Sequence, residues 1–149
     1  MNDKIILLVE DNPDDEALTL RALQKNKIAA EIAVARDGVE AIEYLQIGDH
    51  TSPATNRPLP QVILLDVKLP RVDGIEVLRR IRAHDRTKHL LVIILTSSLE
   101  KQDMDRAYGL HVNSYIRKPV DFTQFVEAVR QIGLYWLILN QPPPVPGER

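Results

Sequence analysis

The chain has 149 residues, a mass of 16.9 kDa and a formal net charge of −2, which suits one compact domain. This charge, with a pI near 6.1, gives no basic field of the kind that drives binding to nucleic-acid backbones. The chain has no cysteine and no apolar run near the roughly 20 residues that span a bilayer, so disulfides, thiolate metal sites and membrane insertion are excluded and we expect a cytoplasmic protein.

Five short apolar runs rich in Ile and Val predict five β-strands. They lie at Ile5–Val9, Ile32–Ala35, Val62–Leu65, Leu91–Leu95 and Tyr115–Ile116. Segments with the apolar spacing of helices follow these runs, so strand and helix alternate five times along the chain. This order predicts an α/β fold, a single (βα)5 doubly wound parallel sheet with helices on both faces.

Each predicted helix begins near a side chain that can accept hydrogen bonds from free backbone amides. Asn12 stands directly before Pro13, which favours the first position of a helix. The other four candidates stand three residues before Glu or Gln, as in a capping box: Asp37, Asp73, Ser97 and Asp121. The sequence therefore predicts a side-chain N-cap for all five helices.

Proline marks the segments that lie outside these elements. The polar stretch Gly48–Gln61 holds three prolines and predicts a long surface loop before the third strand. The run of prolines that begins at Pro142 cannot continue a helix, because proline lacks the amide donor. We predict one domain over residues 1–140, a proline-rich tail over residues 141–149, and no output domain.

Reactive side chains follow four of the predicted strands, and in a parallel sheet these carboxyl ends meet at one edge. Glu10 and Asp11 follow the first strand, Asp66 the third, Thr96 the fourth and Lys118 the fifth. An acid at such a place is often only a turn residue or a helix cap. Chance does not explain the whole set, because caps and turns require neither the lysine nor the threonine. The sequence therefore predicts a functional site at this edge.

Clustered carboxylates repel one another unless a cation lies between them. Mg²⁺ suits the site, since it takes one or two carboxylates and completes its octahedron with water and phosphate oxygens. Asp66 is then expected to attack phosphorus and form an aspartyl phosphate. Lys118 would bind the phosphoryl oxygens, and Thr96 would hydrogen-bond the phosphoryl group of the product.

These features resemble the response-regulator receiver domain, the family of the chemotaxis protein CheY. The likeness runs from Lys4 to Asn140. It rests on four motifs: Leu8-Val9-Glu10-Asp11-Asn12, Leu64-Leu65-Asp66-Val67-Lys68-Leu69-Pro70 with Asp73-Gly74, Leu95-Thr96-Ser97, and Tyr115-Ile116-Arg117-Lys118-Pro119. The resemblance implies a CheY-like, flavodoxin-like fold with strand order 2-1-3-4-5. It implies a phosphoacceptor protein of a two-component system that promotes its own phosphotransfer and autodephosphorylation, not an enzyme with a separate substrate.

The resemblance also assigns metal ligands. It implies that Asp11 and Asp66 bind Mg²⁺ directly, with Mn²⁺ as a substitute, and that the backbone carbonyl of Lys68 joins them. Glu10 would act mainly through metal-bound water. The implied partner is a sensor histidine kinase, whose phosphohistidine donates the phosphoryl group.

The same resemblance implies how the signal leaves the site. Thr96 and Tyr115 would form the switch pair, in which the aromatic ring moves inward when the threonine engages the phosphoryl group. The Lys118–Pro119 bond is a candidate cis peptide, which would aim the lysine into the site.

Other functions of such a site fit the sequence less well. A flavodoxin would cradle a phosphate with its first loop, but the acids of this loop would repel a phosphate that has no metal ion beside it. A phosphatase of the Asp-x-Asp type needs a second acid where Lys68 stands. The alternative that stays open is a phosphorylation-independent dimeric adaptor, a binding module on the same fold.

The end of the last predicted helix is apolar on all sides. Six consecutive apolar residues follow Gly133: Leu134, Tyr135, Trp136, Leu137, Ile138 and Leu139. An exposed apolar patch usually marks a partner surface. We therefore predict a homodimer through the fourth helix, fifth strand and fifth helix, with Leu134, Tyr135, Trp136 and Ile138 at the interface. The alternative is that the segment folds back on its own domain.

This extension and the proline tail resemble the stand-alone response regulators paired with cyanobacterial phytochrome histidine kinases. The long loop before Asp66 and the pattern Asn113-Ser114-Tyr115-Ile116 are similar to the same group. The resemblance implies a phytochrome-type kinase as the partner.

Overall fold

The computed structural model describes residues 4–27, 30–48, 58–97, 100–118 and 122–132. Within these residues five strands form one parallel sheet: β1 (Ile5–Val9), β2 (Glu31–Ala35), β3 (Val62–Leu65), β4 (Leu91–Thr96) and β5 (Ser114–Arg117). They pair in the order β2-β1-β3-β4-β5, which confirms the predicted topology. In register, Leu7 of β1 lies beside Ala33 of β2 and Ile63 of β3.

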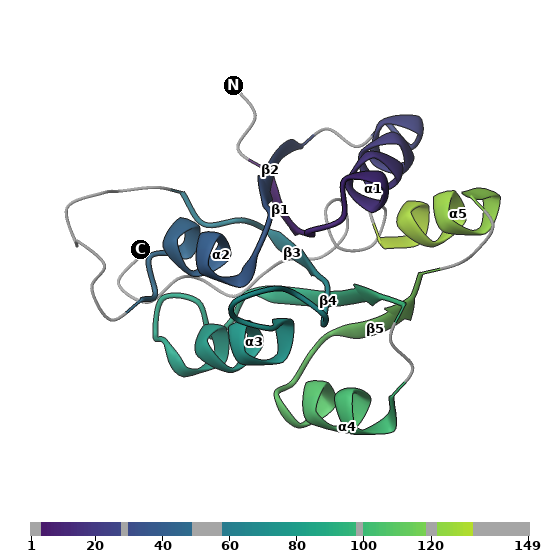
Figure 1. Ribbon diagram of the computed structural model, residues 1–149. Helices are drawn as coiled ribbons and strands as arrows, with labels where there is room; N and C mark the ends of the chain where they lie inside the picture. Colours follow the sequence, from purple (N-terminus) through teal and green to yellow (C-terminus); the bar gives the residue numbers. More distant parts are fainter. Residues whose placement is uncertain (1–3, 28–29, 49–57, 98–99, 119–121, 133–149) are drawn as a thin grey trace.

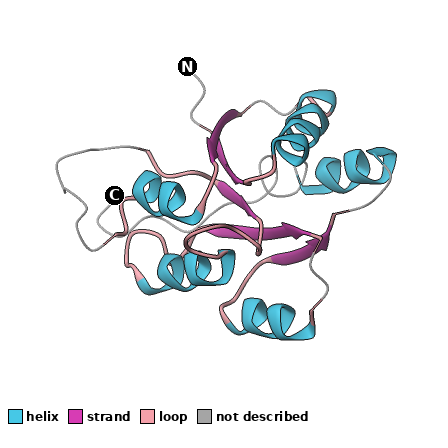
Figure 2. Ribbon diagram, in the orientation of Figure 1, coloured by secondary structure: helices cyan, strands magenta, loops and turns pink. Residues whose placement is uncertain are grey.

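Five helices follow the strands in the described part of the chain: α1 (Pro13–Lys25), α2 (Gly38–Leu45), α3 (Gly74–Ala83), α4 (Lys101–Gly109) and α5 (Phe122–Ile132). Figure 1 shows α1 and α5 together on one side of the sheet, with α2, α3 and α4 on the other. Figure 2 shows the same view with the helices and the strands in different colours. The predicted doubly wound (βα)5 fold is therefore confirmed.

Alternate side chains of the strands enter two apolar cores. Along β1, Leu7 and Val9 join the core beneath α2, α3 and α4, whereas Ile6 and Leu8 join the core beneath α1 and α5. Both faces of the sheet are thus covered, and the strands read as continuous apolar runs for that reason. Burying such side chains supplies most of the free energy that holds the layers together.

Three of the predicted N-caps are confirmed. Asn12 Oδ1 accepts the amides of Asp14 and Asp15 at 2.8 and 3.1 Å. Asp37 caps α2 through the amide of Glu40 at 2.8 Å, and Asp73 caps α3 through the amide of Glu76 at 3.0 Å. These bonds satisfy orphan donors at the helix starts, so each helix begins where the sequence indicated.

The cap predicted at Ser97 is wrong. α4 begins at Lys101, and its N-cap is Glu100, which makes no side-chain cap bond. The Ser-x-x-Glu spacing is a local signal, whereas the packing of a helix against the sheet also decides at which residue the helix starts. The fifth predicted cap, Asp121, lies outside the described residues.

Other predictions also fall outside the described residues. Pro119 of the candidate cis peptide is one, and the proline-rich tail is another. The predicted interface residues Leu134, Tyr135, Trp136 and Ile138 lie outside them as well. Among the helices that are described, none has the length and apolar character needed to cross a membrane.

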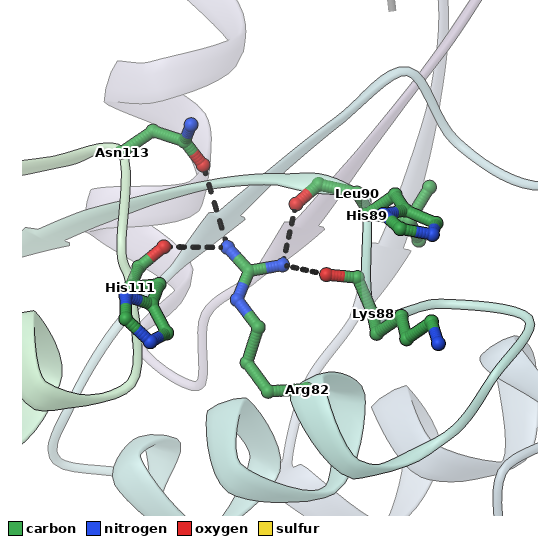
Figure 3. A pocket seen from close by; sticks show the side chains of 6 residues that line it. All are labelled: Arg82, Lys88, His89, Leu90, His111 and Asn113. Atoms are coloured by element: carbon green, nitrogen blue, oxygen red, sulfur yellow. Dashed lines mark hydrogen bonds between the residues drawn. The ribbon is translucent and has the colours of Figure 1, made fainter. Parts of the chain in front are cut away.

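At the amino ends of β4 and β5, the guanidinium of Arg82 joins the two loops that lead into these strands (Figure 3). Its five N–H groups donate to the carbonyls of Lys88, Leu90, Leu110 and His111 and to Asn113 Oδ1, at 2.7 to 3.4 Å. Asn113 Oδ1 also accepts the amide of Val92 at 2.8 Å. Every N–H donor of the Arg82 guanidinium is therefore used inside the fold. The guanidinium has no free donor to offer a ligand in the open depression of about 420 Å³ beside it.

Arg82→Met is expected to lower the free energy of unfolding by about 2–4 kcal/mol, because four carbonyls, two of them in partly buried hydrogen bonds, lose their donor at once. Urea unfolding followed by circular dichroism measures the change. Arg86→Met is the matched control: the guanidinium of Arg86 donates one bond, to the carbonyl of Leu45 at 3.3 Å, so its loss should cost about 0.5–1.5 kcal/mol. Equal losses for the two variants would contradict a bracing role for Arg82.

Candidate functional site

The backbone of the sheet places the predicted site residues at one edge. Sheet-type hydrogen bonds continue past the ends of the strands and fix where each functional side chain starts. The bonds join Glu10 N to Ala35 O at 3.0 Å, Asp66 N to Val9 O at 3.1 Å, and Lys118 N to Thr96 O at 2.8 Å. The expected convergence of strand ends is therefore found.

Gly74 lets α3 begin directly against the backbone of Asp66. The Gly74 amide donates to the carbonyl of Val67 at 2.8 Å. A Cβ atom at Gly74 would lie 1.9 Å from the carbonyl oxygen of Asp66, closer than any real contact. A larger residue would have to push the turn after β3 away from the helix, so glycine here keeps Asp66 in place.

Lys118 lies at the centre of the site. Its Nζ donates to Glu10 Oε1, to Asp15 Oδ2 at 2.9 Å and to Asp66 Oδ2 at 2.9 Å. An ammonium has three N–H groups, so three carboxylates take all of them. The side chains of Glu10 and Asp66 are 2% and 9% exposed, whereas that of Asp15 is 37% exposed.

The sequence predicted the meeting of Lys118 with Glu10 and Asp66, but not Asp15. A signal was present: Asp15 stands in the first turn of the helix that directly follows the acids at the end of the first strand. The run of acids around it hid this signal, since acids in a first turn are expected for the helix dipole alone.

The second oxygen of Asp66 has its own donors. Thr96 Oγ1 donates to Asp66 Oδ1 at 2.6 Å, and the amide of Lys68 donates to the same oxygen at 3.3 Å. Thr96 is fully buried. The predicted juxtaposition of Asp66, Thr96 and Lys118 is therefore present, with a hydroxyl and an ammonium on opposite oxygens of one carboxylate.

Glu10, Asp11 and Asp66 form a group that can hold a metal ion. Each offers a carboxylate oxygen, and the three oxygens lie within 4.8 Å of one another. Asp11 is exposed, while the other two are buried. Oxygen-only ligands of this kind suit a hard cation such as Mg²⁺ or Mn²⁺. The donor set therefore fits the predicted metal, and the carbonyl of Lys68 stays a prediction as a further ligand.

The site carries an excess of negative charge. Burial raises the pKa of Glu10 from its ordinary 4.5 to about 7, the charge of Asp66 adds to the rise, and the hydrogen bond from Lys118 opposes it. Burial alone would lower the pKa of Lys118, but its bonds to Glu10, Asp15 and Asp66 raise the pKa above the ordinary value. A divalent cation would relieve the repulsion that one ammonium leaves.

Mg²⁺ affinity is therefore expected to rise with pH through about 7, because Glu10 is protonated below this pH and must be ionised to favour the cation. Calorimetric titration in two buffers that differ in ionisation enthalpy measures both the affinity and the protons released. Glu10→Gln should remove the dependence across the neutral range. An affinity of the wild type that does not change across this range would contradict the assignment of Glu10.

Tyr115, the predicted switch residue, reaches α4. Its ring is half-buried and lies with its centroid 6.4 Å from the ring of Tyr108, tilted by 33°. Tyr108 is 52% exposed. A movement of the Tyr115 ring would thus change the surface of α4 around Tyr108.

A second link to α4 was not predicted. Lys68 Nζ lies 3.3 Å from Asp103 and 3.5 Å from Glu100. Asp103 is almost fully buried. The loop that follows Asp66 is therefore joined to the start of α4 by an ion pair, and no sequence spacing indicates such a contact, because the residues are more than thirty positions apart.

Comparison with known proteins identifies the family of this chain. A family model described as the response regulator receiver domain matches residues 6–130. The probable methanogenesis regulatory protein FilR2 of Methanothrix harundinacea is 41% identical over 139 residues, which cover 93% of this chain and 87% of that protein. The response regulator Rcp1 of a Synechocystis strain is 37% identical over 134 residues, covering 90% of this chain and 89% of its own.

Solved structures of response regulators are also similar to this chain. The phosphorylated cyanobacterial phytochrome response regulator RcpA superposes with a TM-score of 0.82 at 37% identity, covering 95% of this chain and 99% of that one. The Mn²⁺-bound form of Rcp1 also gives 0.82, at 36% identity and the same coverage. The bacteriophytochrome response regulator AtBRR gives 0.70 at 49% identity, covering 93% of this chain and 98% of that one.

Proposed function

Because this chain belongs to the family of response regulator receiver domains, we propose that it takes a phosphoryl group from the phosphohistidine of a sensor histidine kinase onto Asp66. The observation that carries the proposal is the surroundings of this carboxylate. A buried hydroxyl and an ammonium hydrogen-bond its two oxygens, and two more carboxylates stand beside it. Such a site can hold both a divalent cation and a phosphoryl group.

Asp11 and Asp66 would hold Mg²⁺ directly together with the carbonyl of Lys68, and Glu10 would act through metal-bound water. The group of three carboxylate oxygens supports this assignment, as does the existence of a Mn²⁺-bound form of the related Rcp1. When bound, the cation offsets the negative charge of the carboxylates and of the incoming phosphoryl group.

In the proposed step an oxygen of Asp66 attacks phosphorus in line, the P–N bond to the kinase histidine breaks, and the imidazole leaves with that electron pair. Lys118 is placed to exchange its bond with Asp66 for bonds to phosphoryl oxygens. Thr96, whose hydroxyl already points at Asp66, would donate to the phosphoryl group of the product. Attack by water on the aspartyl phosphate would later reset the protein.

The readout would follow from Thr96 and Tyr115. Movement of the Tyr115 ring beside Tyr108 would alter the face made by α4, β5 and α5. A homodimer through this face, completed by Leu134, Tyr135, Trp136 and Ile138, remains our proposal for the signalling assembly. We also propose that the protein works in the cytoplasm and does not bind nucleic acid directly.

The phytochrome type of the kinase is supported by likeness alone. RcpA is a cyanobacterial phytochrome response regulator and AtBRR is a bacteriophytochrome response regulator, whereas FilR2 is a probable methanogenesis regulatory protein. Transfer from autophosphorylated kinases of candidate types to this chain, compared at early times, would identify the cognate class. Equal slow transfer from all of them would argue against a phytochrome-type partner.

Phosphorylation itself is tested with Mg²⁺ and a small phosphodonor such as acetyl phosphate. We expect the intact mass to rise by one phosphoryl group, and we expect chelation of Mg²⁺ to prevent the rise. No mass gain in the wild type would contradict the proposal and favour the phosphorylation-independent adaptor.

A further inference from the structure

Asp15 contacts the functional lysine from outside the metal group. It lies in the first turn of α1, and its Oδ2 is 2.9 Å from Lys118 Nζ. Within the described part of the chain, the group of possible metal ligands consists of Glu10, Asp11 and Asp66, and Asp15 is not among them. Two of the three acceptors of Lys118 therefore belong to the metal group, and the third does not.

This division matters once a cation binds. Glu10 and Asp66 would then share their charge with the metal, and Asp66 would carry the phosphoryl group. The attraction of these two side chains for the ammonium of Lys118 would therefore weaken. Asp15 keeps its full charge for Lys118. A lysine side chain has several rotatable bonds and costs conformational entropy to fix in one place. A dedicated carboxylate lowers that cost at the moment of transfer.

The backbone of Asp15 is itself held in position. Asn12 Oδ1 accepts the amides of Asp14 and Asp15 at 2.8 and 3.1 Å, which fixes the first turn of α1 at the edge of the site. The contact between Asp15 and Lys118 thus joins two anchored elements, the capped start of α1 and the end of β5.

We propose that Asp15 is a positioning residue for phosphoryl transfer, which holds the ammonium of Lys118 over Asp66 while Glu10 and Asp66 engage the metal and the phosphoryl group. This inference rests on the proposed function. Asp15 would then have a role in transfer besides complementing the dipole of α1.

The chain offers a matched control in Asp14. Asp14 stands in the same first turn and is exposed, and the three N–H groups of Lys118 are taken by other residues. Asp14→Asn and Asp15→Asn remove the same charge from the same helix end. Only the second removes a partner of Lys118.

The test measures the rate of phosphorylation by acetyl phosphate at saturating Mg²⁺, with thermal unfolding of each variant recorded beside it. Asp15→Asn is expected to slow the reaction about fivefold and Asp14→Asn less than about twofold, as befits one partly exposed charge-assisted bond. Asp15→Glu should recover at least half of the loss. In a Lys118→Met background, Asp15→Asn should have no further effect, because the pair no longer exists.

Two results would overturn the inference while leaving the proposed function in place. One is an equal slowing by Asp14→Asn and Asp15→Asn, and the other is an undiminished effect of Asp15→Asn without Lys118. A wild type that takes up no phosphoryl group would instead overturn the proposed function, and this inference with it.

Discussion

Asp66→Asn is expected to abolish phosphorylation while the protein stays folded. An amide is not a nucleophile toward phosphorus, yet it has nearly the size of the carboxylate and can still accept the bond from Thr96 Oγ1 that the native side chain accepts at 2.6 Å. The variant also lacks one of the three carboxylates of the metal group, so it should bind Mg²⁺ more weakly. Intact mass after exposure to acetyl phosphate and Mg²⁺ should show no gain.

Asp73→Asn is the control for this variant. It makes the same chemical change seven residues along the chain, at the exposed N-cap of α3. Asparagine caps helices as well as aspartate does, so both folding and phosphorylation should survive. If Asp66→Asn gained as much phosphoryl group as the wild type and Asp73→Asn do, the assignment of Asp66 as the acceptor would be contradicted.

Lys118→Met is expected to slow phosphorylation by roughly 10²–10³-fold, which is the usual effect of removing one charge that stabilises a transition state. Mg²⁺ affinity should stay the same or rise, because the ammonium competes with the cation for Glu10 and Asp66. Rates from mass spectrometry and affinities from calorimetry give both quantities for one variant.

Lys88→Met serves as the comparison for Lys118→Met. Lys88 is exposed in the loop before β4, at the opposite end of the strand from the site. Its loss should change neither the rate nor the metal affinity. If Lys118→Met instead lost Mg²⁺ binding and kept its rate at saturating metal, the lysine would be a structural support of the metal group and not a participant in transfer.

The sheet could be predicted closely because both of its faces are buried. Such strands read as continuous apolar runs, and the limits of β1 and β3 match the predicted runs residue for residue. β2, β4 and β5 each extend one or two residues further, into polar positions such as Glu31 and Thr96. Apolar content alone does not show where backbone pairing stops.

The candidate site could be predicted as far as strand ends alone determine it. Asp66, Thr96 and Lys118 follow strands directly, so parallel topology is enough to bring them together. Contacts made by helices were missed. Asp15 meets Lys118 only because α1 packs back over the edge of the sheet, and Lys68 meets Asp103 only because α4 lies beside the loop after β3.

The start of α4 shows the same limit. A capping pattern at Ser97 was complete in sequence, yet the helix begins at Lys101. The packing of the helix on the sheet also decides where it starts, and a four-residue capping pattern does not report that packing.

Mapping the phosphoryl group within the chain shows which residue accepts it. Borohydride reduction of freshly phosphorylated wild-type protein, followed by digestion and tandem mass spectrometry, marks an aspartyl phosphate by its conversion to homoserine. We expect one such conversion, at position 66, that depends on Mg²⁺. Conversion at another acid, with position 66 unmodified, would contradict it.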